Sequence, residues 1–167
     1  MKNTLEQKIT QLGKQLLAND QMIATAESCT GGLVAAAITS VAGSSSWFDR
    51  GFVTYSNEAK QEMLGIQADT LSEFGAVSEE TAREMAAGAL LLSYAQISVS
   101  ITGIAGPDGG TDDKPVGTIW FAWSIKTDGL EIETQTKKES FIGDRNSIRQ
   151  QAVVTALEGL IKIANKK

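Results

Sequence analysis

The chain has 167 residues, of which 42% are hydrophobic and 21% are charged, and its net charge is −5. These values are typical of a globular protein, and the length predicts a single domain over residues 1–167; disordered and collagen-like classes are excluded. The acidic balance argues against a nucleic-acid partner, which would require a concentrated basic face. The sequence contains no histidine, which excludes Ser-His-Asp triads, Cys-His dyads and metal sites with imidazole ligands.

The single cysteine, Cys29, allows no internal disulfide and is typical of a reducing compartment. Residues 1–17 contain no apolar signal segment, and no stretch approaches the ~20 apolar residues of a membrane span. We therefore expect a cytoplasmic protein with no membrane partner.

Apolar spacing and turn residues divide the chain into alternating helices and strands. We expect helices at about 4–18, 33–40, 57–64, 78–94 and 144–164, and strands at about 22–26, 52–55, 97–101, 116–125 and 130–141. This alternation predicts an α/β fold, a three-layer α/β/α sandwich. The expected hairpin within 116–141 requires a mixed sheet, which we predict to be mostly parallel.

The segment Glu27-Ser-Cys-Thr-Gly-Gly32 places a hydroxyl residue between a strand and a helix, as is typical of a nucleophile. Backbone N–H groups of Thr30, Gly31 and Gly32 would lie at the helix N-terminus, where they can hold an oxyanion. The alternative is that Ser28 or Thr30 only caps the helix. A Cys29 nucleophile would lack its usual histidine base, so Ser28 is the better candidate.

A serine nucleophile needs a base, and Lys60 is the candidate. With Asn57 as N-cap, Lys60 would be the third residue of a helix, where the macrodipole and burial both lower the pKa of an amine. Tyr55 ends the preceding strand and could orient the amine or relay its proton. The alternatives are an ordinary solvated lysine and a tyrosine at the edge of the core.

Two further segments are candidates for binding. The glycine-rich loop at 102–115 follows a strand, where α/β sheets bind ligands, and it lacks phosphate-loop and dinucleotide spacing. Its three aspartates lack the glutamate of a calcium loop, so we expect no metal. Arg145 and Arg149 share one face of the last helix and could bind a phosphate or carboxylate, or pair with local acids.

Taken in order, these motifs resemble those of one family, the CinA C-terminal domain family, and within it the stand-alone amidohydrolases acting on nicotinamide mononucleotide. The resemblance spans about residues 5–160, and it is carried by the segments AESCTGG, GSSSWFDRGFVTYSNEAK, GAVSEETA, ITGIAGPDGG, KPVGT and FIGDRNSIRQQA. It implies a CinA C-terminal-like fold and an enzyme that hydrolyses the carboxamide of this nucleotide in pyridine nucleotide salvage, without a metal or cofactor.

The resemblance also implies roles for residues. It implies a Ser/Lys mechanism in which Ser28 and Lys60 are catalytic together with Tyr55. We expect the substrate-binding residues to be Thr102, Gly103, Ala105, Gly106 and Arg145. The partner is then a small-molecule nucleotide, and a homo-oligomer is expected for a small enzyme of this kind.

Two other functions stay open from the sequence. A non-catalytic nucleotide-binding module or inactive paralogue would keep the glycine-rich loop and Arg145 but use Ser28 only as a cap. A Cys29-dependent amidase acting on free nicotinamide is the other alternative, and the missing histidine counts against it.

Overall fold

The computed structural model describes residues 4–129 and 131–165. The helices are α1 (Thr4–Ala18), α2 (Leu33–Thr39), α3 (Asn57–Leu64), α4 (Ala68–Phe74), α5 (Glu79–Leu91) and α6 (Arg145–Ala164), with a short 3₁₀ turn at Ser44–Ser46. The strands are β1 (Ile23–Glu27), β2 (Phe48–Val53), β3 (Ile97–Gly103), β4 (Thr118–Lys126) and β5 (Ile132–Ser140). Among these described residues, no helix is both long and apolar enough to cross a membrane.

The strands form one sheet in the order β2-β1-β3-β4-β5. β1 pairs in parallel with both β2 and β3, whereas β3 with β4 and β4 with β5 are antiparallel. β4 therefore runs against β3 and β5, while β2, β1, β3 and β5 share one direction. The predicted mixed sheet is confirmed: four of its five strands share one direction, and two of its four pairings are parallel.

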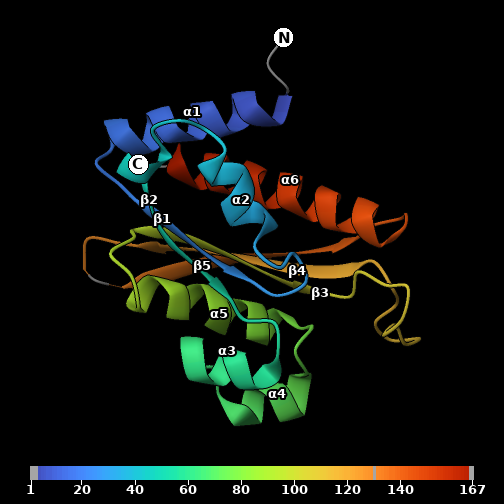
Figure 1. The fold of residues 1–167 in the computed structure, drawn as a ribbon. Coiled ribbons are helices and arrows are strands. Elements are labelled where there is room, and N and C mark those ends of the chain that lie inside the picture. Colours follow the sequence, from blue (N-terminus) through green and yellow to red (C-terminus); the bar gives the residue numbers. More distant parts are fainter. Residues whose placement is uncertain (1–3, 130, 166–167) are drawn as a thin grey trace.

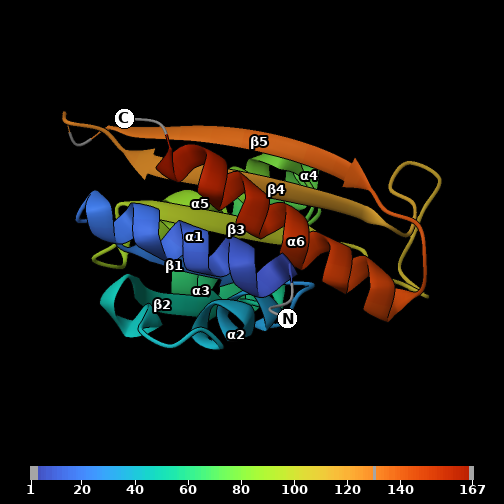
Figure 2. The ribbon, with the colours of Figure 1, turned by 90° about the horizontal axis from the view of Figure 1, so that it is seen from above.

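Helices cover both faces of this sheet, which confirms the predicted three-layer sandwich. α1, α2 and α6 lie on one face, and α5 lies on the other with α3 and α4 beneath it (Figure 1). α1 and α6 run side by side across the first face (Figure 2). The spacing that predicted the first helix buries Ile9, Leu12 and Leu16 of α1 against the sheet.

The sheet topology places the Ser28 turn and the glycine-rich loop at the same end of the sheet. From β1 the chain goes to β2 on one side, and it then returns past β1 to β3 on the other side. Open α/β sheets bind ligands beyond the carboxyl ends of strands at such a reversal of strand order. Ser28 directly follows β1 and the glycine-rich loop directly follows β3, so this edge is where a site is expected.

Three local predictions were wrong. The second strand is Phe48–Val53 and not 52–55, because the edge strand β2 exposes Arg50 and therefore lacks an apolar run. Helix α4 was missed, since its seven residues bury just Leu71. The N-cap of α3 is Ser56, whose Oγ accepts from the Ala59 N–H at 3.0 Å, so Asn57 is the first helical residue. The expected strand start at Leu130 lies outside the described residues.

α6 approaches the sheet closely at Gly159. The indole ring of Trp123 on β4 stacks on Phe121 with ring centroids 5.6 Å apart, and its N–H donates to the Ala156 carbonyl of α6 at 3.0 Å. A Cβ added at Gly159 would overlap the indole ring. The absence of a side chain at this position therefore sets the distance between α6 and β4.

We predict that Gly159→Ala destabilises the protein by about 1–3 kcal/mol, because overpacking against a buried ring outweighs the ~1 kcal/mol that alanine adds to helix propensity. The measurement is the free energy of unfolding from urea denaturation. Gly129→Ala is the control, since the atom nearest to its added Cβ lies 3.9 Å away. Equal stability of Gly159→Ala and the wild type would contradict the packing argument.

Candidate active site

Ser28 and Lys60 come from different elements and meet at the carboxyl edge of the sheet. Ser28 follows β1, and Lys60 is the fourth residue of α3, a helix that begins after the Ser56 cap and ends at Gly65 in a left-handed conformation. The Lys60 side chain points inward and is 1% exposed. Its Nζ lies 3.0 Å from the Ser28 Oγ.

The surroundings of the Lys60 amine suit a neutral base. Burial lowers the pKa of Lys60 below its ordinary value. The Nζ also lies 3.0 Å from the Thr54 carbonyl oxygen and 3.1 Å from that of Tyr55. A neutral amine can donate its two N–H groups to these carbonyls, which leaves the nitrogen lone pair for the Ser28 O–H. The arrangement is therefore that of a nucleophile paired with a general base.

The two glutamates of α3 do not offset the lowering of the Lys60 pKa by burial. Glu58 and Glu62, which could have raised the pKa of the amine, are both exposed at the surface of the helix. The Lys60 amine instead faces a serine hydroxyl and two uncharged carbonyls. Burial therefore remains the main influence on its pKa.

The neighbouring Cys29 is poorly suited to be the nucleophile. Its side chain is buried, and burial raises the pKa of its thiol to about 12. At neutral pH the group is a protonated thiol, which is a much weaker nucleophile than a thiolate. The structure therefore weighs against the alternative of a Cys29-dependent amidase.

The turn that carries Ser28 is held from two sides. The buried carboxylate of Glu27 accepts from the N–H groups of Val34 and Ala35 at 2.9 and 3.0 Å, and this ties the end of β1 to the first turn of α2. On the outer side, the Arg149 guanidinium donates to the carbonyls of Cys29 and Thr30 at 3.1 and 3.4 Å. These charge-assisted bonds fix the backbone around the nucleophile.

This bonding changes the expected roles of two residues. The Gly31 N–H, which we expected to hold an oxyanion, donates to the Ser28 carbonyl at 3.0 Å and closes a tight turn. Arg149, expected to share an anion site with Arg145, is engaged by the turn instead. The oxyanion roles of the Thr30 and Gly32 amides stay predictions.

A cavity of about 280 Å³ opens beside the Ser28 hydroxyl. It is lined by the following residues: Ser28, Cys29, Tyr55, Asn57, Lys60, Ala76, Val77, Thr102, Gly103, Ile104, Ala105, Gly106, Asp108, Gly109 and Arg145. The cavity therefore brings together the predicted nucleophile, the predicted base and all five predicted substrate-binding residues. Whether these residues contact substrate stays a prediction.

Within this cavity, Arg145 and Tyr55 lie together. Arg145 donates to the Gly106 carbonyl at 2.7 Å and to the Tyr55 phenol oxygen at 3.3 Å. Tyr55 thus contacts Lys60 through its main-chain carbonyl and contacts Arg145 through its phenol. Thr102 is fully buried, and its hydroxyl donates to the Ala76 carbonyl at 2.8 Å, which anchors the α4–α5 connection beside the cavity.

Sequence reasoning missed the structural roles of Glu27 and Arg149. Glu27 had a usable signal, since a carboxylate at the end of a buried strand needs donors and the next helix offers free N–H groups. Arg149 had none, because its partners lie about 120 residues earlier in the chain. Among the described residues, no group of three or more cysteine, aspartate or glutamate side chains gathers in a way that could hold a metal ion.

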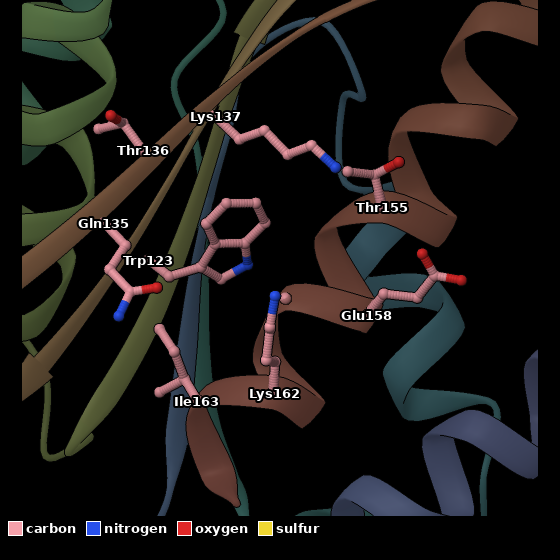
Figure 3. A pocket seen from close by; sticks show the side chains of 9 residues that line it. Trp123, Gln135, Thr136, Lys137, Thr155, Glu158, Lys162 and Ile163 are labelled. Atoms are coloured by element: carbon pink, nitrogen blue, oxygen red, sulfur yellow. The ribbon is translucent and has the colours of Figure 1, made fainter. Parts of the chain in front are cut away.

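A second hollow, of about 290 Å³, lies between β5 and α6 (Figure 3). Two of its charged groups pair with residues outside the lining: Lys137 bonds the Glu139 carboxylate at 2.8 Å, and Glu158 pairs with Lys8. The Trp123 indole at its floor is already bonded to α6. The Ser28–Lys60 cavity has the paired nucleophile and base, and we therefore take it as the candidate active site.

The model of the CinA C-terminal domain family matches residues 5–164. The chain belongs to this family. It is 53% identical over 157 residues to the nicotinamide-nucleotide amidohydrolase PncC of Escherichia coli K12, an alignment that covers 93% of this chain and 92% of that protein. The Pseudomonas putida protein of the same name is 45% identical over 157 residues, covering 94% and 95%.

Solved structures of the CinA superfamily share the fold. The competence/damage inducible protein CihA of Agrobacterium tumefaciens superposes with a TM-score of 0.90 at 43% identity, covering 99% of this chain and 98% of that one. A CinA superfamily protein of Klebsiella pneumoniae has a TM-score of 0.88 at 40% identity, covering 97% and 98%. The predicted resemblance and the CinA C-terminal-like fold are thereby confirmed.

The buried amine predicts a pH-dependent contribution to stability. Because the pKa of Lys60 is lower in the folded than in the unfolded protein, the unfolded state binds more protons between the two pKa values, and stability rises with pH across that window. We expect the free energy of unfolding of the wild type, relative to Lys60→Met, to increase as pH rises toward ~10, the ordinary lysine range.

The measurement is urea denaturation of both proteins over a pH series. Lys14→Met, at an exposed position of α1, is the control and should show no such trend. A difference between wild type and Lys60→Met that stays constant with pH would mean that burial does not lower the pKa of this amine.

Proposed function

We propose that this chain hydrolyses the carboxamide of nicotinamide mononucleotide to nicotinate mononucleotide and ammonia, and that it serves pyridine nucleotide salvage. The relatives named nicotinamide-nucleotide amidohydrolase support the substrate and the reaction class, since they are 45–53% identical over nearly the whole chain. The observation that carries the proposal is the 3.0 Å contact between the buried Lys60 amine and the Ser28 hydroxyl.

The first half of the reaction forms an acyl-enzyme. Neutral Lys60 takes the proton of Ser28 as the Oγ bonds to the carboxamide carbon, and the electron pair of the C=O bond moves to oxygen. The protonated amine then has three hydrogens for the Ser28 Oγ and the carbonyls of Thr54 and Tyr55, which stabilise its charge. Lys60 passes its proton to the amide nitrogen, the C–N bond breaks and ammonia leaves.

The second half repeats these steps with water. Lys60, again neutral, takes a proton from a water molecule whose oxygen attacks the acyl carbon. The bond from this carbon to the Ser28 Oγ breaks, the proton returns to Oγ, and nicotinate mononucleotide is released. The same amine therefore acts as base and as acid in both halves, so the reaction requires no histidine, which the chain lacks.

Arg145 is proposed to bind the phosphate of the nucleotide. It is the first residue of the 20-residue helix α6, so the positive end of the helix dipole adds to the charge of its guanidinium. Its contacts with the Gly106 carbonyl and the Tyr55 phenol hold it at the cavity. Tyr55 then acts by orienting Arg145 as well as through its carbonyl on Lys60.

A non-catalytic nucleotide-binding module is the second candidate, because it too would use the cavity and Arg145. The buried lysine argues against it: a binding site gains nothing from an amine that faces a serine hydroxyl at the cost of desolvation. Binding of the nucleotide without ammonia release would establish this second function. The cytoplasmic location and the homo-oligomeric state stay predictions from the sequence.

The first test is ammonia release from nicotinamide mononucleotide, measured without added metal and with a chelator present. We expect the wild type to turn over, and Ser28→Ala and Lys60→Ala each to lose at least ~100-fold in kcat, because each removes one half of a nucleophile–base pair. Cys29→Ala, which changes the residue next to Ser28, is the control and should retain activity.

Circular dichroism and thermal unfolding of each variant show that loss of activity is not loss of fold. Activity that survives Ser28→Ala but disappears in Cys29→Ala would overturn the Ser/Lys mechanism in favour of a cysteine nucleophile.

The phosphate assignment has its own test. Arg145→Met should raise the KM for nicotinamide mononucleotide about 10-fold or more, as expected for loss of a charge-assisted contact, and leave turnover of nicotinamide riboside, which lacks the phosphate, unchanged. Arg83→Met, at an exposed position of α5, is the control. An equal effect on both substrates would show that Arg145 does not read the phosphate.

A further inference from the structure

One of the three amides expected to hold an oxyanion at the start of α2 is unavailable, because the Gly31 N–H is already engaged. The Gly31 N–H donates to the Ser28 carbonyl, and the N–H groups of Val34 and Ala35 donate to the Glu27 carboxylate. A tetrahedral intermediate on Ser28 nevertheless requires a donor for its negatively charged oxygen. Resting on the Ser28–Lys60 mechanism proposed above, we infer that the main-chain N–H of Gly103, the last residue of β3, is this donor.

The direction of the Gly103 amide follows from the pairing of β3. Toward β1, the Ile97 N–H donates to the Met22 carbonyl, and the Ile101 carbonyl accepts from the Ser28 N–H. Toward β4, the Ile104 N–H donates to the Thr118 carbonyl at 2.9 Å. Peptide groups of successive residues in a strand alternate between its two neighbours. The odd-numbered Gly103 therefore directs its N–H toward the β1 side.

On that side, β1 has already ended. Its last residue, Glu27, pairs with Ile101, and the chain turns away at Ser28. Among the backbone bonds of the described residues outside the regular elements, none uses the Gly103 N–H. The amide therefore points past the end of β1 into the space where Gly103 and Ser28 line the same cavity.

The surroundings of Gly103 explain why no side chain covers this amide. A Cβ at position 103 would overlap the Ile119 side chain of β4 and lie 2.7 Å from the Thr118 carbonyl oxygen. β4 thus excludes a side chain at this position, and the rigid pairing of Gly103 with Ile119 holds its peptide plane. A donor held in this way needs no reorganisation when charge develops.

The Gly103 N–H stabilises the tetrahedral intermediate through a hydrogen bond alone. As the Ser28 Oγ bonds to the carboxamide carbon, the C=O electron pair moves to oxygen, and the Gly103 N–H donates a hydrogen bond to that oxygen. When the C–N bond breaks, the electron pair returns and the hydrogen bond weakens. The donor transfers no proton, and Lys60 alone carries the proton between Oγ and nitrogen.

The first test replaces Gly103 by glycolic acid, which exchanges the Thr102–Gly103 amide for an ester, so that an oxygen replaces the N–H and the Thr102 carbonyl becomes a weaker acceptor. We expect kcat to fall ~100-fold or more, as for loss of one oxyanion donor, with KM nearly unchanged. The same ester at Gly43, which does not line the cavity and has no atom within 4 Å of an added Cβ, is the control. A kcat within about threefold of wild type would overturn the inference.

A second measurement needs no altered backbone. The probe is a nicotinamide mononucleotide analogue whose carboxamide is replaced by a boronic acid, which forms a tetrahedral adduct with an active serine. We expect the Gly103 amide proton to shift downfield in the NMR spectrum of the wild-type adduct, and not when the probe is added to Ser28→Ala. A tetrahedral boron signal with an unmoved Gly103 amide would overturn this inference and leave the Ser/Lys proposal standing.

Absence of a tetrahedral boron signal with the wild type would overturn the Ser28 nucleophile, and the Gly103 inference with it.

Discussion

Burying the Lys60 amine is the constraint on which the candidate site depends. Lys60 is 1% exposed, and a charge on its buried amine is energetically unfavourable. The pKa of the amine is therefore lowered, and its hydrogens need acceptors within the protein. The carbonyls of Thr54 and Tyr55 are those acceptors, and they are available because the chain leaves the sheet after β2 and enters α3 directly. The third position around the nitrogen is occupied by the Ser28 hydroxyl.

That geometry requires β1, β2 and α3 to be placed relative to one another, and the parallel half of the sheet does this. The Thr54 N–H donates to the Glu27 carbonyl at 2.9 Å, which joins the end of β2 to the residue before the nucleophile. Glu27 then ties β1 to α2 through its carboxylate, and Arg149 ties the nucleophile turn to α6. Two helices from one face of the sheet, α2 and α6, therefore restrain the same turn, as preorganised catalysis requires.

The reversal of strand order around β1 explains why the cavity lies where it does. Ser28 follows β1 and Gly103 ends β3, and the pairing between these two strands ends at Glu27 and Ile101. Main-chain groups that a longer sheet would have used stay available to a ligand at this edge. The cavity and the free amide of Gly103 follow from this termination of pairing, and Arg145 at the start of α6 lines the same cavity.

The sequence by itself determined the α/β layers, the positions of most helices and the identity of Ser28 and Lys60 as a candidate pair, because periodicity and motifs are local properties. It could not determine which backbone donors and acceptors remain free. Gly31 and Arg149 were predicted to bind a ligand, but in the fold Gly31 bonds Ser28, and Arg149 bonds Cys29 and Thr30. The Tyr55 phenol contacts Arg145. Those partners lie up to 120 residues apart, so only tertiary packing could assign them.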